Sequence, residues 1–259
     1  MTAYIKQVLI TGASSGIGAQ LAKDYLALGY RVFACGRNAE RLNAIPGVFG
    51  LVFDMDVREG VQSAGRYLAH ELGGQPLDII ILNAGTCEYI DDAINFDDQL
   101  FARIIHTNLI ATGYCLAAFL PLLAKGGRLG LMSSSATFLP LPRAEAYGAS
   151  KAGISYLAAS LGVDLAAANI SVSCISPGFV ATPLTDKNDF PMPMRISVDK
   201  AAGAIIRGLD KRQHQINFPR GFIVLMKLVS WLPYRWWVKL MGQQNNKSTK
   251  VPDIQGLKK

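Results

Sequence analysis

The run LDIIILN, at positions 77–83, is the feature that most restricts how this chain can fold. Four consecutive residues, from Ile79 to Leu82, are large and apolar. Because successive side chains of a strand point to opposite faces of the sheet, a strand without polar alternation is buried on both faces. Such strands belong to parallel sheets that are covered by helices on both sides. The run therefore predicts a buried strand in a sheet of this kind.

Short β-rich runs and helix-length amphipathic segments alternate along most of the chain. This alternation is typical of an α/β fold, a parallel sheet with helices on both faces and right-handed crossovers. The predicted strands are 7–11, 30–35, 48–53, 77–83, 127–134, 170–176 and a short one in HQINFP (214–219). The predicted helices are 16–28, 38–44, 58–72, 97–124, 146–167 and one that begins near Ser197, a good N-cap.

Composition indicates one sizeable globular domain, or at most two small ones. The 259 residues are 50% hydrophobic and 17% charged. Cys35, Cys87, Cys115 and Cys174 are widely spaced in apolar runs with no C-x-x-C pair, so we interpret them as small buried side chains in a reducing compartment. The first residues lead almost directly into a strand without a signal-peptide pattern, and we expect a cytoplasmic protein.

The net charge of +7 is concentrated near the C-terminal end. Residues 207–259 contain 11 Lys and Arg against two Asp, a net charge of +9, so residues 1–206 carry −2. A nucleic-acid-binding domain is expected to carry a basic patch on its folded body. We therefore predict no nucleic-acid partner.

The segment TGASSGIG (11–18) follows the first predicted strand and opens the first predicted helix. Gly12, Gly16 and Gly18 allow a tight turn and a close approach of the backbone to a pyrophosphate, which the free N–H groups of the helix N-terminus attract. The spacing differs from the G-x-G-x-x-G dinucleotide fingerprint. A glycine-rich turn can also be purely structural, but its place at the first strand–helix junction favours a cofactor loop.

Five motifs in order make the chain resemble the short-chain dehydrogenase/reductase family, in its common form of about 250 residues. They are TGASSGIG, Asp56-Val57, NAG at 83–85, YGASK at 147–151 and PGFVAT at 177–182, and the match covers roughly residues 5–210. The resemblance implies a doubly wound, Rossmann-type sheet in one catalytic domain over 1–218. Residues 219–259 would then form a C-terminal extension that is not an independent domain.

The resemblance also implies a set of residues that bind a nicotinamide cofactor. Asp56 and Val57 match the adenine contact, Asn83 to Gly85 pass close to the cofactor, and the PGFVAT turn contacts the nicotinamide carboxamide and the phosphates. The implied cofactor-binding residues are Thr11, Gly12, Ser14, Ser15, Gly16, Ile17, Gly18, Arg37, Asp56, Val57, Asn83, Ala84, Gly85, Tyr147, Lys151, Pro177, Gly178, Val180 and Thr182. No metal-ligand spacing is present, so we predict no metal site.

Arg37 bears on the choice between the two nicotinamide cofactors. An acidic residue at the end of the second strand would bind the ribose hydroxyls and repel a 2′-phosphate. Here that position is Gly36, and Arg37 follows it. Since a guanidinium holds phosphate through forked, charge-assisted bonds, we predict NADP(H) over NAD(H). The alternative is an arginine that starts a helix and points into water.

Tyr147 and Lys151 are spaced by one helical turn and would lie on the same face of a helix. A tyrosine has a pKa of about 10, and a fixed ammonium beside it, with the positive nicotinamide of the oxidised cofactor, is expected to lower that pKa toward neutrality. The resemblance implies that Tyr147 is the proton donor, with Ser134 fixing the carbonyl oxygen and Asn108 relaying protons through water toward Lys151. Ser133 and Ser135 remain alternatives to Ser134.

The chain departs from the soluble tetrameric members of the family after residue 218. The apolar run 221–232 is interrupted by Lys227 and ended by Pro233, so it is too short to span a bilayer. Aromatic and basic residues then alternate in PYRWWVK, a composition that suits a membrane interface. A substrate lid or an oligomer surface fits equally well. We expect a homo-oligomer, a dimer rather than a tetramer, with possible contact at the cytoplasmic face of a membrane.

These observations predict an NADP(H)-dependent oxidoreductase that interconverts a carbonyl and a secondary alcohol. The apolar tail, and Phe190, Met192 and Met194 in the expected substrate loop at 185–197, indicate a hydrophobic or lipid-like small-molecule substrate. The alternative is an NADP(H)-binding sensor or membrane-surface scaffold without turnover. A pure binder needs no proton donor, so the tyrosine and its partners favour the enzyme.

Overall fold

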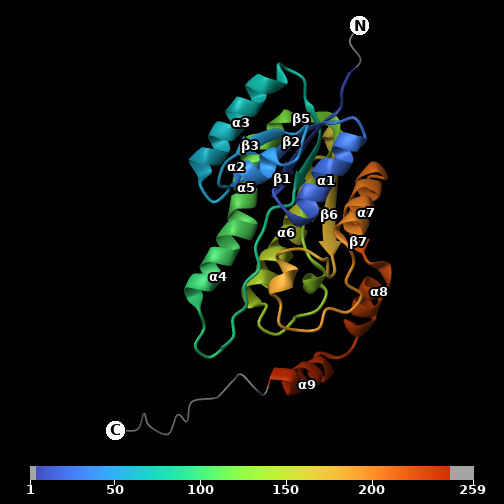
Figure 1. The fold of residues 1–259 in the computed structure, drawn as a ribbon. Coiled ribbons are helices and arrows are strands. Elements are labelled where there is room, and N and C mark those ends of the chain that lie inside the picture. The colour runs from blue at the N-terminus through green and yellow to red at the C-terminus, as the bar shows by residue number, and fades with distance from the viewer. Residues whose placement is uncertain (1–3, 246–259) are drawn as a thin grey trace.

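The protein is built around a seven-stranded sheet whose neighbouring strands all run parallel (Figure 1). The structure is a computed structural model that describes residues 4–245. The strand order is β3-β2-β1-β4-β5-β6-β7, so the winding reverses between β1 and β4. The predicted doubly wound α/β fold is confirmed. The strands are β1 (Gln7–Thr11), β2 (Arg31–Gly36), β3 (Phe49–Val52), β4 (Leu77–Leu82), β5 (Leu123–Met132), β6 (Ser171–Pro177) and β7 (Gln215–Phe218).

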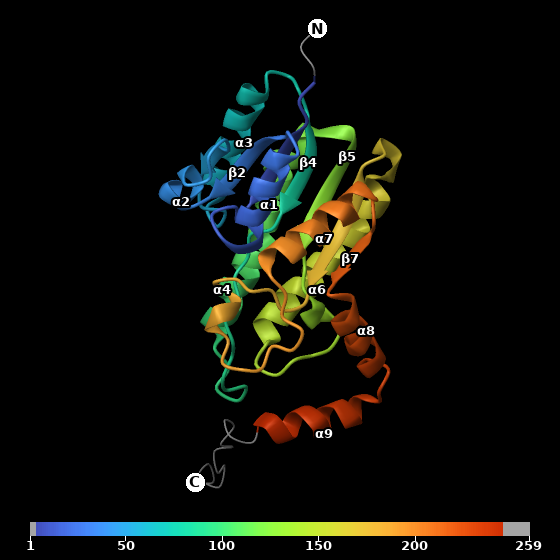
Figure 2. The ribbon, with the colours of Figure 1, turned by 45° about the vertical axis from the view of Figure 1, so that its right-hand side comes forward.

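Helices cover both faces of this sheet. On one face α1 and α7 lie side by side (Figure 2). On the other face α3 packs against α5, and α6 packs against β5, β6 and α4. The short helix α2 lies beside β2 and β3. The helices are α1 (Gly16–Ala27), α2 (Ala39–Asn43), α3 (Arg58–Leu72), α4 (Asp98–Ile105), α5 (Ala111–Phe119), α6 (Glu145–Asp164) and α7 (Val198–Asp210).

Strand β4 is buried on both faces, as its sequence predicts. Ile79 and Ile81 pack in the core beneath α1 and α7. Leu77, Ile80 and Leu82 pack in the core beneath α3, α5 and α6. All five are at most 5% exposed, and full burial of such a side chain contributes about 1.5–3 kcal/mol. One strand therefore anchors both helical layers.

The long helix predicted over 97–124 is confirmed as a continuous helical run, Asp98–Leu122, but its interior and its end are not regular α-helix. The structure has α4, a π-helical turn (His106–Ile110), α5 and a 3-10 turn (Leu120–Leu122), and β5 then begins at Leu123 rather than at 127. Pro121 has no backbone N–H with which to continue an α-helix, so α5 ends before it. The helical run Asp98–Leu122 has the length and mean hydropathy, 1.3, of a membrane-spanning segment, but α5 packs on α3 and β4 as part of the domain.

Two helices follow the sheet and lie at the end where its strands terminate (Figure 2). They are α8 (Arg220–Val229) and α9 (Tyr234–Asn245). Phe222, Ile223 and Met226 of α8 and Trp237 of α9 form a separate apolar cluster with Leu139. The Trp237 ring N–H also donates a hydrogen bond of 2.7 Å to the carbonyl oxygen of Pro140. The extension is thus packed on the domain. Residues 246–259 of the extension lie outside the described residues.

A glycine at position 18 lets α1 pack tightly against the loop before it. A Cβ there would lie 2.3 Å from the carbonyl oxygen of Gly12 and 2.6 Å from the side-chain nitrogen of Asn83. We therefore predict that Gly18→Ala lowers the free energy of unfolding by about 1–3 kcal/mol. Gly113 is a matched control, because a Cβ in its place on α5 would meet no described atom within 4 Å. Gly113→Ala should raise stability by roughly 0.5–1 kcal/mol. Urea unfolding of both variants tests this, and equal effects would contradict it.

Candidate active site

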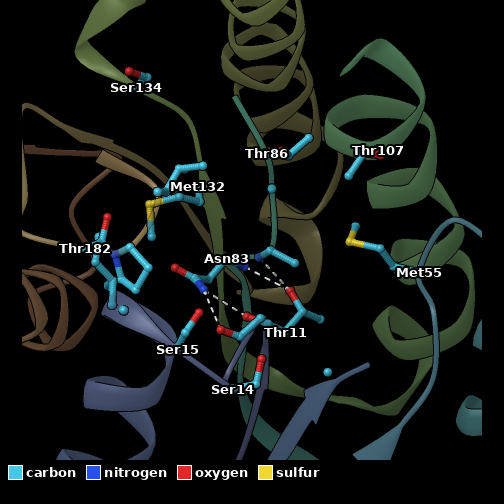
Figure 3. A pocket seen from close by; sticks show the side chains of 18 of the residues that line it. Thr11, Ser14, Ser15, Met55, Asn83, Thr86, Thr107, Met132, Ser134 and Thr182 are labelled. Atoms are coloured by element: carbon cyan, nitrogen blue, oxygen red, sulfur yellow. Dashed lines mark hydrogen bonds between the residues drawn. The ribbon is translucent and has the colours of Figure 1, made fainter. Parts of the chain in front are cut away.

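A cleft of about 530 Å³ opens at the carboxyl edge of the sheet, where the winding reverses between β1 and β4. Ligands of doubly wound sheets bind at such points. Its walls come from the ends of β1, β2, β4, β5 and β6 and from the first turn of α1 (Figure 3). The predicted site residues that line it are Thr11, Gly12, Ser14, Ser15, Gly16, Ile17, Arg37, Asp56, Asn83, Ala84, Gly85, Ser134, Tyr147, Lys151, Pro177, Gly178, Val180 and Thr182.

Thr11 and Asn83 join the ends of β1 and β4 at the base of this cleft. The Thr11 hydroxyl accepts from the backbone N–H groups of Asn83 and Ala84, at 3.0 and 3.1 Å. The Asn83 side-chain amide donates to the carbonyl oxygens of Thr11, at 3.0 Å, and Gly12, at 3.4 Å (Figure 3). These two side chains therefore act as a brace that holds the loop after β1 against β4.

The loop after β1 presents backbone N–H groups to the cleft. Gly12 and Gly16 have φ angles of +66° and +54°, which only glycine adopts without strain. Ser15 is the N-cap of α1, and its side chain forms no capping hydrogen bond within the described residues. The first N–H groups of a helix have no intrahelical partner and attract anions. This end of the cleft is suited to a pyrophosphate. Gly18 lies behind the loop and does not line the cleft.

Arg37 lies at the edge of the cleft beyond β2. Its guanidinium is 3.7 Å from the Asp54 carboxylate, and its side chain is 73% exposed. Because Gly36 carries no side chain and packs close to Ser14, nothing acidic stands at the end of β2 itself. The exposed N–H groups of Arg37 are available to a phosphate here.

Asp56 also lines the cleft, two residues beyond Asp54 in the sequence. One of its carboxylate oxygens accepts from the Thr107 hydroxyl at 2.9 Å. The other, Oδ1, is buried and has no hydrogen-bond partner among the described residues, although the His106 ring nitrogen is 3.5 Å away. A buried carboxylate oxygen without a donor is costly unless a ligand supplies one. Val57 is half exposed at the N-cap of α3 and does not line the cleft.

The three serines after β5 have different surroundings. The Ser133 hydroxyl donates to the carbonyl oxygen of Lys151 at 2.9 Å and lies 2.7 Å from the Ser155 hydroxyl, so it joins β5 to α6. Ser135 is buried and does not line the cleft. Ser134 lines it, and its hydroxyl accepts only the backbone N–H of Ala136, among described residues. Of the three, Ser134 has a hydroxyl that is free to donate into the cleft.

Tyr147 and Lys151 lie one turn apart on α6 and face the cleft together. The Lys151 ammonium is 5.8 Å from the centre of the Tyr147 ring and donates to the carbonyl oxygen of Met132 at 2.9 Å. Burial lowers the pKa of Lys151 to about 8. Burial also raises the pKa of Tyr147, the Cys87 thiol adds to this rise, and Ser134 partly offsets it.

In the protein alone, burial governs the pKa of Tyr147 and Lys151 is not among its causes. The lowering expected from Lys151 together with the oxidised cofactor stays a prediction. Both groups are taken out of water, and desolvation disfavours the charged form of each. For the phenol this effect is larger than any other in the site. Tyr147 is consequently held in its protonated form, as a proton donor requires.

Asn108 does not line the cleft but supports it from behind. It lies in the π-helical turn and is 1% exposed. Its side-chain amide donates to the carbonyl oxygen of Thr86 and to the Ser150 hydroxyl, each at 2.9 Å, and accepts the N–H of Thr86 at 2.8 Å. Since these bonds use both N–H groups of the amide and bind its oxygen, the side chain of Asn108 joins the loop after β4 to α6.

The turn after β6 closes the cleft from the other side. The N–H of Gly178 donates to the carbonyl oxygen of Phe218 at 2.7 Å, which fixes the turn to β7. Thr182 lies beside the loop after β1, because a Cβ at Gly16 would be 3.2 Å from the Thr182 methyl group. Its backbone N–H donates to the Thr185 hydroxyl at 3.1 Å. This hydrogen bond fixes the start of the segment 185–197.

Comparison with known proteins identifies the family. A family model described as short chain dehydrogenase matches residues 6–191. The chain belongs to the short chain dehydrogenase family. An uncharacterised oxidoreductase of Myxococcus xanthus (strain DK1622) is 34% identical over 236 residues, which cover 88% of this chain and 93% of that protein. The predicted family is thus confirmed, and its curated relatives include oxidoreductases.

Solved structures agree on the fold of this short-chain dehydrogenase. One from Streptomyces avermitilis has a TM-score of 0.79 at 22% identity and covers 95% of this chain and 99% of that one. One from Sphingobium yanoikuyae, in complex with NADPH, has a TM-score of 0.74 at 24% identity and covers 98% of both chains. Both are short-chain dehydrogenases. The agreement at this identity concerns the fold.

Sequence reasoning missed several residues of this dehydrogenase that lie in or beside the cleft. The cleft is also lined by three residues near the carboxyl ends of predicted strands, namely Asp54, Thr86 and Met132. The rule that ligands bind at the carboxyl edge of such a sheet could have found them. Cys87 was grouped with three buried cysteines, but it is only partly buried and its thiol influences the pKa values of both Tyr147 and Lys151. No local sequence signal separates it from the other three.

Apolar and aromatic side chains extend from the reacting end of the cleft toward α8. The rings of Tyr89 and Phe190 are 5.6 Å apart, those of Phe190 and Phe179 are 6.1 Å apart, and those of Phe179 and Phe222 are 5.5 Å apart. Arg143 secures this wall, since it pairs with Asp91 at 2.7 Å and with Asp189 at 3.0 Å. The segment 185–197 is thereby held over an apolar region next to the catalytic tyrosine candidate.

Proposed function

We propose that this short-chain dehydrogenase is an NADP(H)-dependent oxidoreductase that interconverts a carbonyl and a secondary alcohol. The observation that carries the proposal is the joint placement of Tyr147, Lys151 and Ser134 on the cleft next to an anion-binding helix N-terminus. A proton donor, a nearby cation and a second hydroxyl are the groups that reduction of a carbonyl requires.

The shape of the cleft fits a dinucleotide. The N–H groups at the start of α1 would hold the pyrophosphate, and the buried Oδ1 of Asp56 would accept from the adenine amino group. Arg37 would hold a 2′-phosphate in place of, or beside, the Asp54 carboxylate. The similar structure from Sphingobium yanoikuyae is a complex with NADPH, which supports the choice of NADP(H).

The side chains at the other end of the cleft supply the proton and hold the substrate. Bound NADPH supplies the hydride to the carbonyl carbon, and in the reverse direction NADP⁺ accepts it. The Ser134 hydroxyl donates to the carbonyl oxygen and fixes its position. As charge develops on that oxygen, the Tyr147 hydroxyl transfers its proton to it, and a secondary alcohol forms. Lys151 remains protonated below pH 8, and its positive charge stabilises the phenolate that the transfer leaves.

An apolar substrate agrees with the wall of the reacting end. Tyr89, Phe179 and Phe190 form a row of neighbouring aromatic rings beside that end, outside the residues that line the cleft, and Ile90 packs beside Tyr147 in a small apolar cluster. Pockets of this composition bind largely hydrophobic ligands and use a few polar groups for orientation. Ser134 and Tyr147 are those polar groups.

Tyr147→Phe tests the proton donor. The variant keeps the ring and its packing but lacks the hydroxyl, so kcat for ketone reduction should fall by about 10²–10⁴-fold, while NADPH binding, measured by fluorescence titration, should be unchanged. Tyr156→Phe is the matched control, because Tyr156 is 80% exposed on the outer side of the same helix. Unchanged kcat in Tyr147→Phe would remove Tyr147 from the mechanism.

Arg37→Ala tests the cofactor preference. Loss of charge-assisted bonds to a 2′-phosphate costs about 1.5–3 kcal/mol, so the ratio of kcat/KM for NADPH to that for NADH should fall by at least about tenfold. Arg41→Ala is the control, since Arg41 is exposed on α2 away from the cleft. A ratio that stays the same in Arg37→Ala means that another group selects the cofactor.

The pKa of Lys151 predicts how ketone reduction depends on pH. The lowered pKa of about 8 means that the ammonium is present below pH 8 and is lost above it, whereas Tyr147, whose pKa is raised, keeps its proton. The rate at saturating NADPH and ketone should therefore be level below pH 8 and fall above it. Lys151→Arg keeps its charge to higher pH, and its residual rate should not fall in this range. A wild-type rate that is level from pH 7 to 10 would contradict this role of Lys151.

A further inference from the structure

The two C-terminal helices expose an unusual number of large apolar side chains. We call these residues the α8–α9 outer face. They are Val224, Leu225, Leu228, Trp231, Leu232, Tyr234, Trp236, Val238 and Leu240, and each is between 48% and 85% exposed. The most exposed is Trp231, in the turn between the helices, at 85%. On α9 the exposed apolar residues are two positions apart, so they lie on both flanks of the helix, with Arg235 and Lys239 between them. So many exposed apolar side chains on two neighbouring helices mark an interaction site.

Packing of the domain does not use this face. The inner sides of the helices are already occupied, since Phe222, Ile223, Met226 and Trp237 fill the cluster around Leu139. Val224, Leu225 and Leu228 lie on the side of α8 opposite that cluster. A helix that is apolar on both sides is expected to have a second apolar partner. The outer face is therefore available to a partner outside the described chain.

Charge on and around the face indicates the nature of that partner. Lys227, Arg235 and Lys239 are all exposed on α8 and α9, and the sequence from 211 to 252 contains no Asp or Glu. A second copy of the chain, docked symmetrically through this face, would bring these like charges together. An anionic surface with an apolar interior satisfies both the basic and the apolar side chains.

We propose that the α8–α9 outer face docks on the surface of an anionic lipid bilayer. At 1.5 Å per residue, α8 and α9 are each shorter than about 20 Å, while the hydrocarbon core is about 30 Å thick, so the helices lie in the interface and do not cross it. Trp231, Tyr234 and Trp236 are the aromatic side chains that sit at headgroup level. The basic side chains contact the lipid phosphates.

Docking in this way also orients the reacting end of the cleft. The inner side of α8 contacts the aromatic wall through Phe222 and Phe179, whose ring centres are 5.5 Å apart. An apolar carbonyl compound dissolved in the bilayer would then have a short path to Tyr147. This consequence, unlike the docking itself, rests on the proposed oxidoreductase function.

Tryptophan fluorescence reports on the face, because the chain has three tryptophans and two of them, Trp231 and Trp236, lie on it, while Trp237 is buried in the inner cluster. Full-length protein is mixed with vesicles of phosphatidylcholine alone or of phosphatidylcholine with phosphatidylglycerol, made with and without brominated acyl chains. We expect a blue shift and quenching by brominated lipid with the anionic vesicles, and weaker binding at high salt. Flotation of the same samples measures the bound fraction.

Matched variants separate the aromatic and the basic contributions. Trp231→Ala with Trp236→Ala, and separately Arg235→Glu with Lys239→Glu, should each reduce the vesicle-bound to free ratio by at least about tenfold. Tyr156→Ala and Lys23→Glu change an exposed aromatic and an exposed basic residue elsewhere and should leave binding unchanged. Thermal unfolding confirms that each variant is folded.

Three results would overturn the proposal. The first is no flotation or quenching with anionic vesicles. The second is equal binding of the control and face variants. The third is a dimer that becomes a monomer in the tryptophan variant without any vesicle binding, which would make the face an interface between copies. NADPH oxidation with a water-soluble ketone, measured without vesicles, tests the proposed function separately and should be unaffected by the face variants.

Discussion

The brace between Thr11 and Asn83 is the interaction on which the site depends. In this strand order β1 and β4 are neighbours in the sheet although 70 residues separate their ends nearest the brace, Thr11 and Leu82, and the chain leaves them in opposite directions. Thr11 and Asn83 satisfy backbone groups at the point where the two paths diverge. The loop of Gly12 to Gly16 and the start of α1 are thereby held open toward the cleft. Without that brace the backbone groups that face a phosphate would have no fixed position.

Burial governs the chemistry at the other end of the cleft. Desolvation raises the pKa of Tyr147 and lowers that of Lys151, because burial disfavours the charged form of each group. The protein alone thus holds a neutral phenol beside an ammonium that titrates near pH 8. This arrangement is suited to giving a proton to a carbonyl oxygen. In the reverse direction the same phenol must first lose its proton, which its raised pKa opposes.

Most of the fold could be predicted from the sequence because the apolar periodicities are local. Strand β4 was recognisable because its residues must be buried on both faces, and α7 because Ser197 caps it, as observed. The helix over 97–124 was located by its length and hydropathy, but an apolar run gives no local sign of the π-helical turn, and Leu123 is as compatible with a helix as with the start of β5. Whether Leu123 belongs to a helix or to a strand is decided by the pairing of β5 with β4 and β6.

The candidate site, like the fold, could be predicted only where the sequence signal is local. Motif order located most of the side chains on the cleft, but it could not show that Ser133 joins β5 to α6 while Ser134 faces the cleft, or that the Asn108 amide is bonded to Thr86 and Ser150. It also missed Cys87, which reaches Tyr147 and Lys151 only through the path of the loop after β4. These are properties of contacts between segments distant in sequence.

Transfer of deuterium from cofactor to substrate tests the central claim most directly. The purified protein is incubated with NADPH that carries deuterium at the transferable position of the nicotinamide and with an apolar ketone, and the product is analysed by mass spectrometry. The account predicts an alcohol with one deuterium on the carbon that bore the carbonyl oxygen. An alcohol without deuterium, or NADPH that binds in the cleft but transfers nothing to a broad set of ketones and aldehydes, would contradict it.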